Sequence, residues 1–262
     1  LKLKTVHKLT GLFFVLIFFL STGVSASDLN KEKRWAEQVV DAILDGEAIW
    51  LEDGSSQFLG IFSESEEESN RAVIIMHGTG VHPDWQQVIQ PLRVGLTERK
   101  WNTLSIQMPV LANDAQYLDY APLYDEVAPR IDASIKYLNN KGIKDIVLIG
   151  HSQGSAMTAY YLSTSEQKVN GFVAIGMASF AEDSRMDSVN ALKKIQVPVL
   201  DLYGKEDLDN IIASAGDRAA AAKESGNKKY TQTVIAGNHF FDEHEDSLVK
   251  TVADWLEENN SN

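Results

Sequence analysis

The sequence contains no cysteine, so it can form neither a disulfide nor a thiolate metal site, and processing cannot attach a lipid to a cysteine. Basic residues are also scarce: 24 lysines and arginines stand against 37 aspartates and glutamates, and the formal net charge is −13. Such an acidic chain repels nucleic acid and anionic lipid, and it disfavours a polyanionic substrate. We therefore expect no nucleic-acid partner.

Long apolar runs are missing as well, with one exception near the N-terminus. Residues 9–20 are largely apolar and uncharged, three lysines precede them, and the small residues of segment 24–26 follow. This pattern is typical of a signal peptide, with cleavage predicted after Ala26. The run falls short of the roughly 20 residues that a membrane-spanning helix needs. We therefore expect residues 1–26 to be removed, leaving a periplasmic or secreted protein without stable membrane insertion and with a net charge of −16.

The rest of the chain has the composition of one globular domain. With 262 residues, of which 44% are hydrophobic, the chain is long enough to bury one sizeable core, and no shift in composition divides it. We expect an N-terminal part, residues 27–70, within the same domain as the catalytic core, residues 71–262. The N-terminal part contains an amphipathic helical pattern at residues 31–44 and a hairpin pattern at residues 48–51 and 57–62. We expect this helix to pack at the edge of the domain.

Short apolar runs alternate with helical patterns along the core. The runs have the length and the β-branched composition of buried parallel strands, and they cover residues 72–76, 104–106, 146–149, 171–175, 197–203 and 233–235. The helical patterns cover residues 85–100, 122–140, 155–162, 209–223 and 243–258. This alternation predicts an α/β fold, a mostly parallel central sheet with helices on both faces.

The most informative segment is a predicted strand that runs into Gly150-His151-Ser152-Gln153-Gly154 and then into a helical pattern. A nucleophilic serine must stand at a sharp turn between a strand and a helix, where glycines let the two backbones approach closely. The helix also directs its positive N-terminal end towards developing negative charge. This context predicts that Ser152 is a nucleophile, whereas a purely structural turn is the alternative interpretation.

A base must accept the proton of the serine, because a hydroxyl is a weak nucleophile at neutral pH. With a nucleophile in this type of turn, the base comes last in the chain. His239 fits that position, since it follows the run at 233–235 and should lie at the same sheet edge as Ser152. The other histidines lie in the leader, in other motifs or away from a strand end. A structural loop histidine is the alternative role for His239.

A third group must orient the imidazole and stabilise its cation, which requires a carboxylate at another strand end. Asp207 is the best candidate, because it comes three residues after the glycine that ends the run at 197–203. Glu206 and Asp209 are neighbours that could take its place, and Asp183 is a possible acid after the preceding strand, whereas Asp201 is expected within the strand itself. A solvated cluster of charges is the alternative interpretation.

A tetrahedral intermediate needs two backbone N–H donors, which form the oxyanion hole. One should belong to Gln153, directly after the nucleophile. The other should follow an early strand, and the glycine-rich segment 77–80 offers it from Thr79 or, less readily, from Gly78. Taken alone, this segment could also be a simple turn.

The chain resembles the α/β-hydrolase superfamily from about Arg71 onward, and it looks closest to a family of exported bacterial α/β-hydrolase proteins of unassigned function. The resemblance rests on His77-Gly78-Thr79-Gly80, on segment 101–110, on Gly150-His151-Ser152-Gln153-Gly154, on segment 198–204 and on Gly237-Asn238-His239. It implies the mechanism of the superfamily, with an acyl-enzyme on the serine, and no particular substrate.

Three functions remain open at this stage. An exported serine hydrolase acting on a small ester or acyl substrate is preferred, with peptidase and thioesterase activity as neighbours on the same triad. A catalytically silent binding protein of the bacterial envelope is the second hypothesis. A metal hydrolase is the third, with ligands drawn from His77, His82 and Asp84 or from His239, Asp242 and His244. No motif predicts a cofactor, and the oligomeric state is not predicted.

The segment between the runs at 171–175 and 197–203 is too short to hold a large lid domain. The loop at 109–121 could overhang the site instead, and we expect Val110, Leu111 and Tyr117 to bind substrate through an apolar wall. Covering the edge of the core is the alternative role for these three side chains.

Overall fold

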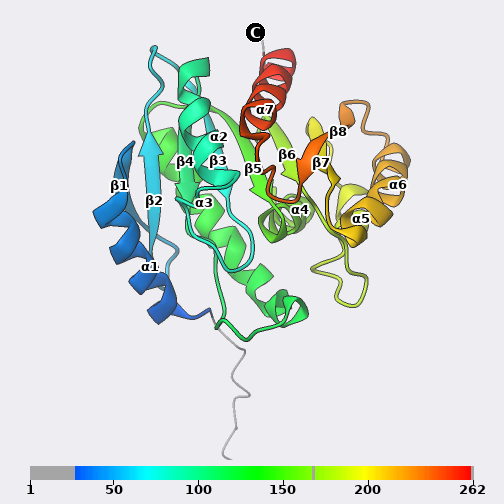
Figure 1. Ribbon diagram of the computed structural model, residues 1–262, viewed down its shortest axis with the longest axis horizontal. Coiled ribbons are helices and arrows are strands. Elements are labelled where there is room, and N and C mark those ends of the chain that lie inside the picture. The colour runs from blue at the N-terminus through cyan, green and yellow to red at the C-terminus, as the bar shows by residue number, and fades with distance from the viewer. Residues whose placement is uncertain (1–26, 167–168, 261–262) are drawn as a thin grey trace, which may run out of the picture.

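The computed structural model describes residues 27–166 and 169–260, so the predicted signal peptide lies outside the described residues. Its centre is one eight-stranded sheet with the strand order β1-β2-β4-β3-β5-β6-β7-β8 (Figure 1). The strands are β1 (Glu47–Glu52), β2 (Gln57–Ser63), β3 (Arg71–Met76), β4 (Asn102–Ile106), β5 (Asp145–His151), β6 (Gly171–Ile175), β7 (Val199–Glu206) and β8 (Tyr230–Asn238).

The direction of the strands decides where a site can form. β2 pairs antiparallel with both β1 and β4, whereas every neighbouring pair from β4 to β8 is parallel. The carboxyl ends of β3, β5, β6, β7 and β8 therefore meet at one edge of the sheet. In an open α/β sheet, ligands bind in the crevice at this edge.

Helices cover both faces of the sheet. They are α1 (Leu29–Ala42), α2 (Ile89–Gly95), α3 (Val127–Asn140), α4 (Gln153–Thr164), α5 (Ser188–Leu192), α6 (Asp209–Glu224) and α7 (Glu245–Asn260), with 3₁₀ helices η1 (Thr97–Arg99) and η2 (Tyr117–Glu126). α2 and α7 lie together on one face, and α3, α4, α5 and α6 lie on the other (Figure 1). The sequence prediction of an α/β fold with helices on both faces is confirmed.

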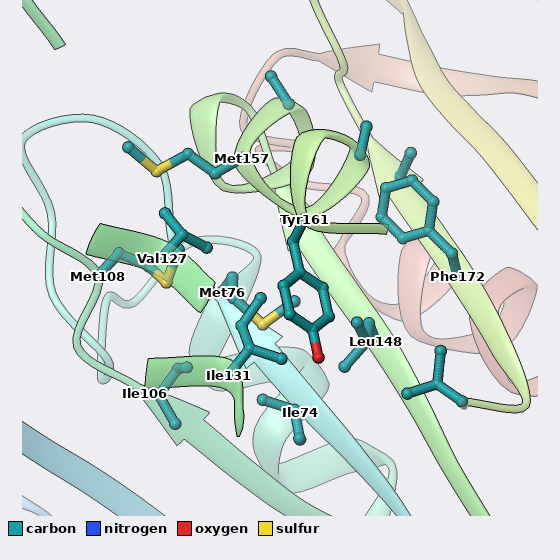
Figure 2. Close-up of a cluster of buried hydrophobic side chains, with 14 of the residues drawn as sticks. Ile74, Met76, Ile106, Met108, Val127, Ile131, Leu148, Met157, Tyr161 and Phe172 are labelled. Atoms are coloured by element: carbon teal, nitrogen blue, oxygen red, sulfur yellow. The ribbon is translucent and has the colours of Figure 1, made fainter. Parts of the chain in front are cut away.

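The larger part of the core lies between the sheet and the α3–α4 layer. Figure 2 shows side chains of β3, β4, β5 and β6 packed against side chains of these two helices. The labelled members are Ile74, Met76, Ile106, Met108, Val127, Ile131, Leu148, Met157, Tyr161 and Phe172. Full burial of a large aliphatic or aromatic side chain stabilises a fold by roughly 1.5–3 kcal/mol, so this layer anchors β5, the strand that leads into Ser152.

The N-terminal helix belongs to the same body as the sheet. Asp28 caps α1, because its carboxylate accepts a hydrogen bond from the backbone N–H of Lys31 at 2.9 Å. On the apolar side of α1, Ala36 and Val39 pack against residues of β2. α1 thus covers the antiparallel end of the sheet, near the edge where the sequence predicted it.

Two predicted helices are interrupted. The pattern at 85–100 forms α2 and η1 and becomes helical only at Ile89, because Val88 has a positive φ of 61°, which a continuous right-handed helix cannot contain. The pattern at 122–140 divides into the end of η2, which contains Pro122, and the α-helix α3. The hydrophobic spacing was right, and the local backbone set different helix ends.

Nothing of the size of a lid follows β6. Between β6 and β7 the described chain forms a loop and the five-residue helix α5, so the predicted absence of a large lid domain is confirmed for residues 27–166 and 169–260. None of the helices in these ranges is both long and apolar enough to cross a membrane.

Candidate active site

Ser152 stands at the turn between β5 and α4. Its backbone has φ 54° and ψ −123°, a strained conformation for a residue with a side chain. Gly150 and Gly154 make the turn possible: a Cβ on Gly150 would lie 2.5 Å from the Cα of Ser155, and one on Gly154 would lie 2.5 Å from the carbonyl oxygen of His77. Because β5, α4 and the loop at His77 approach each other this closely, the turn places the Ser152 side chain at the edge of the sheet.

The three side chains of the predicted triad come together at this edge. Nε2 of His239 lies 2.9 Å from Oγ of Ser152, and Nδ1 of the same ring lies 2.7 Å from Oδ1 of Asp207. His239 follows directly after β8, and Asp207 follows β7. The two contacts form a continuous chain from carboxylate to imidazole to hydroxyl, the arrangement that allows the imidazole to take the serine proton.

Asp207 is a buried carboxylate with several donors. Burial by itself would raise its pKa, but the hydrogen bond and attraction from His239 and the backbone N–H groups of Leu208 and Gly204 outweigh burial and lower it. The carboxyl group therefore stays ionised at neutral pH. An ionised Asp207 can accept the Nδ1–H of His239 and stabilise the imidazolium when it forms.

The loop that carries His239 is fixed by residues that the sequence analysis did not select. Nε2–H of His151 donates to the backbone carbonyl of His239 at 3.0 Å. The side chain of Asn238 accepts from the backbone N–H of Phe240 at 2.9 Å and donates to Asp242 at 2.8 Å. An asparagine just before the histidine was a signal for such a turn, since Asn side chains readily bond the backbone two residues on.

The residues predicted for the oxyanion hole lie beside the serine. A Cβ on Gly78 would be 2.9 Å from the Cβ of Ser152, so the segment 77–80 runs directly past this serine. Oγ1 of Thr79 donates to Oε1 of Gln153 at 2.6 Å, which joins the two predicted donors through their side chains. Gln153 also opens α4, where first-turn N–H groups have no acceptor within the helix.

The structure does not place Val110 and Leu111 open to a substrate. Their exposed fractions are 1% and 8%, and Leu111 belongs to the hydrophobic core. Tyr117 is partly buried and packs on Phe180, with ring centroids 4.8 Å apart. Val110 and Leu111 thus have the alternative role that the sequence left open, and only Tyr117 remains near the surface.

The other candidate acids have different partners. Asp201 is fully buried on β7 and accepts hydrogen bonds from Arg218, Tyr230 and Gln232. Asp183 pairs with Arg185 at 2.7 Å. Each carboxylate is thus held in its own network, away from the His239 ring.

Three of the residues proposed as metal ligands are likewise engaged elsewhere. Asp84 pairs with Arg93 at 2.6 Å, and Asp242 accepts from Gln87 and Asn238. His77 uses both ring nitrogens in hydrogen bonds. Among the described residues, no group of three or more His, Asp or Glu side chains could hold a metal ion.

Comparison with solved structures defines the class of protein. Est1E from Butyrivibrio proteoclasticus is 15% identical, with a TM-score of 0.65 over 82% of this chain and 99% of its own. Dienelactone hydrolase from Anabaena variabilis is 16% identical, with a TM-score of 0.66 over 81% of this chain and 97% of its own. XC6422 from Xanthomonas campestris, described as an α/β serine hydrolase without lid, is 13% identical, with a TM-score of 0.64 over 83% and 96%. The chain has the α/β-hydrolase fold.

The sequence itself defines the family. The chain belongs to the family described as "Protein of unknown function (DUF3530)", whose profile matches residues 25–124 and 119–258. No curated protein matches the sequence. The family description carries no activity and no export, so the function must be argued from the site.

Proposed function

We propose that this protein is an exported serine hydrolase that cleaves carboxylic esters through an acyl-enzyme on Ser152. The observation that carries the proposal is the unbroken chain from Asp207 to His239 to Ser152, with heavy-atom distances of 2.7 and 2.9 Å. Hydrogen-bond reach between nucleophile and base, with the base oriented by a third group, is the geometric signature of nucleophilic catalysis.

His239 relays a proton twice, once as the acyl-enzyme forms and once as it is hydrolysed. Oγ of Ser152 attacks the ester carbonyl carbon while Nε2 of His239 takes the hydroxyl proton. The bond to the alcohol oxygen then breaks, the alcohol leaves with that proton, and the acyl group stays on Ser152. Water gives a proton to His239 and attacks the acyl carbon. The carboxylic acid is released, and the proton returns to Oγ of Ser152.

The negative charge on the carbonyl oxygen requires donors that are already oriented. We assign this role to the backbone N–H groups of Gln153 and Thr79, with Gly78 as the residue that lets the turn approach the serine. Loss of one such donor costs about 10²- to 10³-fold in kcat in serine hydrolases. The short Thr79–Gln153 contact at 2.6 Å supports a common position for both donors.

A similar structure supports esters over amides and thioesters, and the open site supports small substrates. The Pyrococcus furiosus protein Pf2001, which has a similar structure, is described as an esterase. The site also has no large lid in the described chain, which favours dissolved substrates of small to moderate size over lipid aggregates. Tyr117 and Phe180 could offer an apolar wall to the acyl group or the leaving group.

A substrate panel tests the proposal. The purified mature protein should hydrolyse at least some short acyl esters in a panel of matched esters, amides and thioesters, and the Ser152→Ala variant should hydrolyse none. A fluorophosphonate probe should label the wild type at Ser152 alone. Failure of the wild type both to label and to turn over any substrate would favour the silent envelope binding protein.

Export rests on the sequence of residues 1–26, which has the charge and hydropathy pattern of a cleaved leader. The test is N-terminal sequencing of the protein recovered from the periplasm or the medium, with Ser27 expected as its first residue. Protein that retains residues 1–26 in the membrane fraction would contradict both the cleavage and the localisation.

A further inference from the structure

His77 is held in one tautomer at the base of the oxyanion turn. Its ring is buried, and burial lowers its pKa to about 3, so it is neutral at physiological pH. The backbone N–H of Met108 donates to Nε2 at 2.9 Å, so Nε2 carries no proton. The proton of the neutral ring is therefore on Nδ1, which donates to the carbonyl oxygen of Gly78 at 2.8 Å.

That hydrogen bond also fixes the direction of the Thr79 amide. Gly78 C=O and Thr79 N–H belong to one peptide group, and the described chain contains no cis peptide bond. In a planar trans peptide the two groups point in opposite directions. With the Gly78 carbonyl bound by His77, the Thr79 N–H points away from the buried ring.

The position of His77 depends in turn on the loop after β4. Besides Met108, the side chain of Gln107 lies 3.0 Å from Nε2 of His77. The next residues of this loop are bound to the start of α1: the backbone N–H of Asp28 donates to Val110 at 2.7 Å, and Nζ of Lys31 donates to Leu111 O at 2.7 Å.

A buried ion pair completes the link. Nη1 of Arg130 on α3 lies 2.9 Å from Oε2 of Glu32 on α1, and Nη2 donates to Oε1 of the same carboxylate at 3.3 Å. The same guanidinium donates to the backbone carbonyl of Gln107 at 3.0 Å, and Glu32 accepts from Val110 N–H at 3.3 Å. Both charged side chains are almost fully buried.

The energetics of this pair favour a positioning role. Burial raises the pKa of Glu32, and the attraction of Arg130 offsets that effect only in part. The carboxylate is thus ionised less readily than in water, so the ion pair is a poor source of stability. Apolar side chains at both positions could hold α1 on the domain, but they could not bind the carbonyl of Gln107 or the amide of Val110.

We propose that α1 is part of the oxyanion-hole scaffold. Glu32 and Arg130 fix the loop at 107–111, the loop fixes His77, and His77 directs the Thr79 N–H towards the reacting carbonyl oxygen. The proposal rests on the serine hydrolase mechanism above. It makes Glu32, Arg130 and His77 positioning residues, which act on the transition state although Glu32 lies on a helix that covers the antiparallel end of the sheet.

Kinetics of two ion-pair variants test the proposal, with a second buried pair as control. Glu32→Gln should lower kcat about 10- to 100-fold and change KM less than twofold. The reason is that a misplaced Thr79 N–H would weaken the hydrogen bond to the reacting oxygen mainly in the transition state. Asp201→Asn breaks the buried pair with Arg218 at the other end of the sheet. It should lower Tm comparably and keep kcat within twofold of the wild type when both are measured well below Tm.

The double variant Glu32→Gln/Arg130→Met separates positioning from stability. Removing both charges should restore much of the Tm lost in the single variant, since Arg130 is no longer buried without Glu32. Asp53, which lies 3.5 Å from Arg130, keeps its hydrogen bonds from Ser55 and Ser56. The proposal requires kcat to stay low in this variant. Recovery of kcat together with Tm, or equal kcat losses in Glu32→Gln and Asp201→Asn, would overturn it.

An NMR measurement makes the test independent of turnover. In ¹⁵N–¹H spectra, the Thr79 amide should shift between wild type and Glu32→Gln, and it should not shift in Asp201→Asn. An unmoved Thr79 resonance in Glu32→Gln would refute the link from α1. The Thr79 resonance could also shift in Glu32→Gln although the wild-type protein hydrolyses no substrate. That result would refute the proposed hydrolase and still support the link from α1 to Thr79.

Discussion

The site has two halves, on either side of Ser152, that are built from different atoms. In the triad half, at the ends of β7 and β8, the side chains of Asp207 and His239 take part in the proposed reaction. In the oxyanion half, after β3, segment 77–80 offers backbone N–H groups, and its side chains serve to orient them. Substitution can therefore delete a reacting group in the first half, but it can only misplace one in the second.

Each half contains a buried, neutral histidine that binds a backbone carbonyl. His151 binds the carbonyl of His239 in the triad half, and His77 binds the carbonyl of Gly78 in the oxyanion half. Burial lowers the pKa of each to about 3. In both halves a ring that never becomes charged near neutral pH holds the backbone of a neighbour in place.

The largest effect is expected where the two halves meet. Ser152→Ala should lower kcat for activated esters at least about a thousandfold, because the hydroxyl contributes to the chemistry and little to packing. Circular dichroism and Tm should show that the fold is kept. A variant with wild-type kcat would remove the serine mechanism and with it the division into halves.

Within the triad half, Asp207→Asn should lower kcat about 10²- to 10⁴-fold, since the imidazole would lose its orienting carboxylate. Asp209→Asn, two residues on and in the exposed first turn of α6, is the matched control and should stay within a few-fold of the wild type. Steady-state kinetics on one ester decide between them. If Asp209→Asn caused the larger loss of kcat, Asp209 and not Asp207 would be the carboxylate that orients the imidazole.

The buried histidines predict how stability depends on pH. Each has a folded pKa of about 3 against 6.5 for the free side chain, so the unfolded state binds more protons between these values. Each ring therefore stabilises the fold above about pH 6.5, and this contribution is lost as the pH falls towards 3. The expected slope is about 1.4 kcal/mol per pH unit for each histidine.

Urea unfolding at several pH values measures this slope. His151→Gln keeps a donor for the His239 carbonyl but does not titrate. The slope of the free energy of unfolding against pH should therefore decrease by about 1.4 kcal/mol per pH unit, which corresponds to one proton. The contribution of His77 should remain. An unchanged slope in His151→Gln would show that His151 is not kept neutral by the fold, and the similarity between the two halves would be wrong.

The smallest effect concerns the surface above both halves. Because no large lid lies over the site in the described chain, the rate should saturate smoothly with substrate and should not change when an ester forms micelles. Initial rates over an ester series should be highest for short or medium acyl chains. A sharp rise at the critical micelle concentration, with long-chain glycerides as best substrates, would show that a mobile cover exists.

The positions of the triad residues could be predicted from local patterns in the sequence. Ser152, Asp207 and His239 each follow a short β-branched run, and the carboxyl ends of parallel strands meet at one edge, so their proximity follows from local patterns alone. The sheet and its two helical layers could be predicted for the same reason. Export and the catalytic roles remain predictions.

The support of the oxyanion half could not be read in the same way. Glu32 and Arg130 are 98 residues apart, and both look like ordinary charges on amphipathic helices. Val110 and Leu111 looked like an exposed apolar wall, because nothing in the sequence indicates that both are buried and that the start of α1 binds their backbone. Long-range burial of polar groups has no periodic signal, so the sequence analysis missed it.

The backbone of Ser152 has a consequence for protein design. A residue with a side chain at φ 54° and ψ −123° costs about 1–3 kcal/mol, and glycine would relieve most of that strain. A procedure that optimised this chain for stability alone would therefore choose Ser152→Gly, and it would produce a more robust protein that had lost its proposed nucleophile. At this position thermostability and turnover compete for the identity of a single residue.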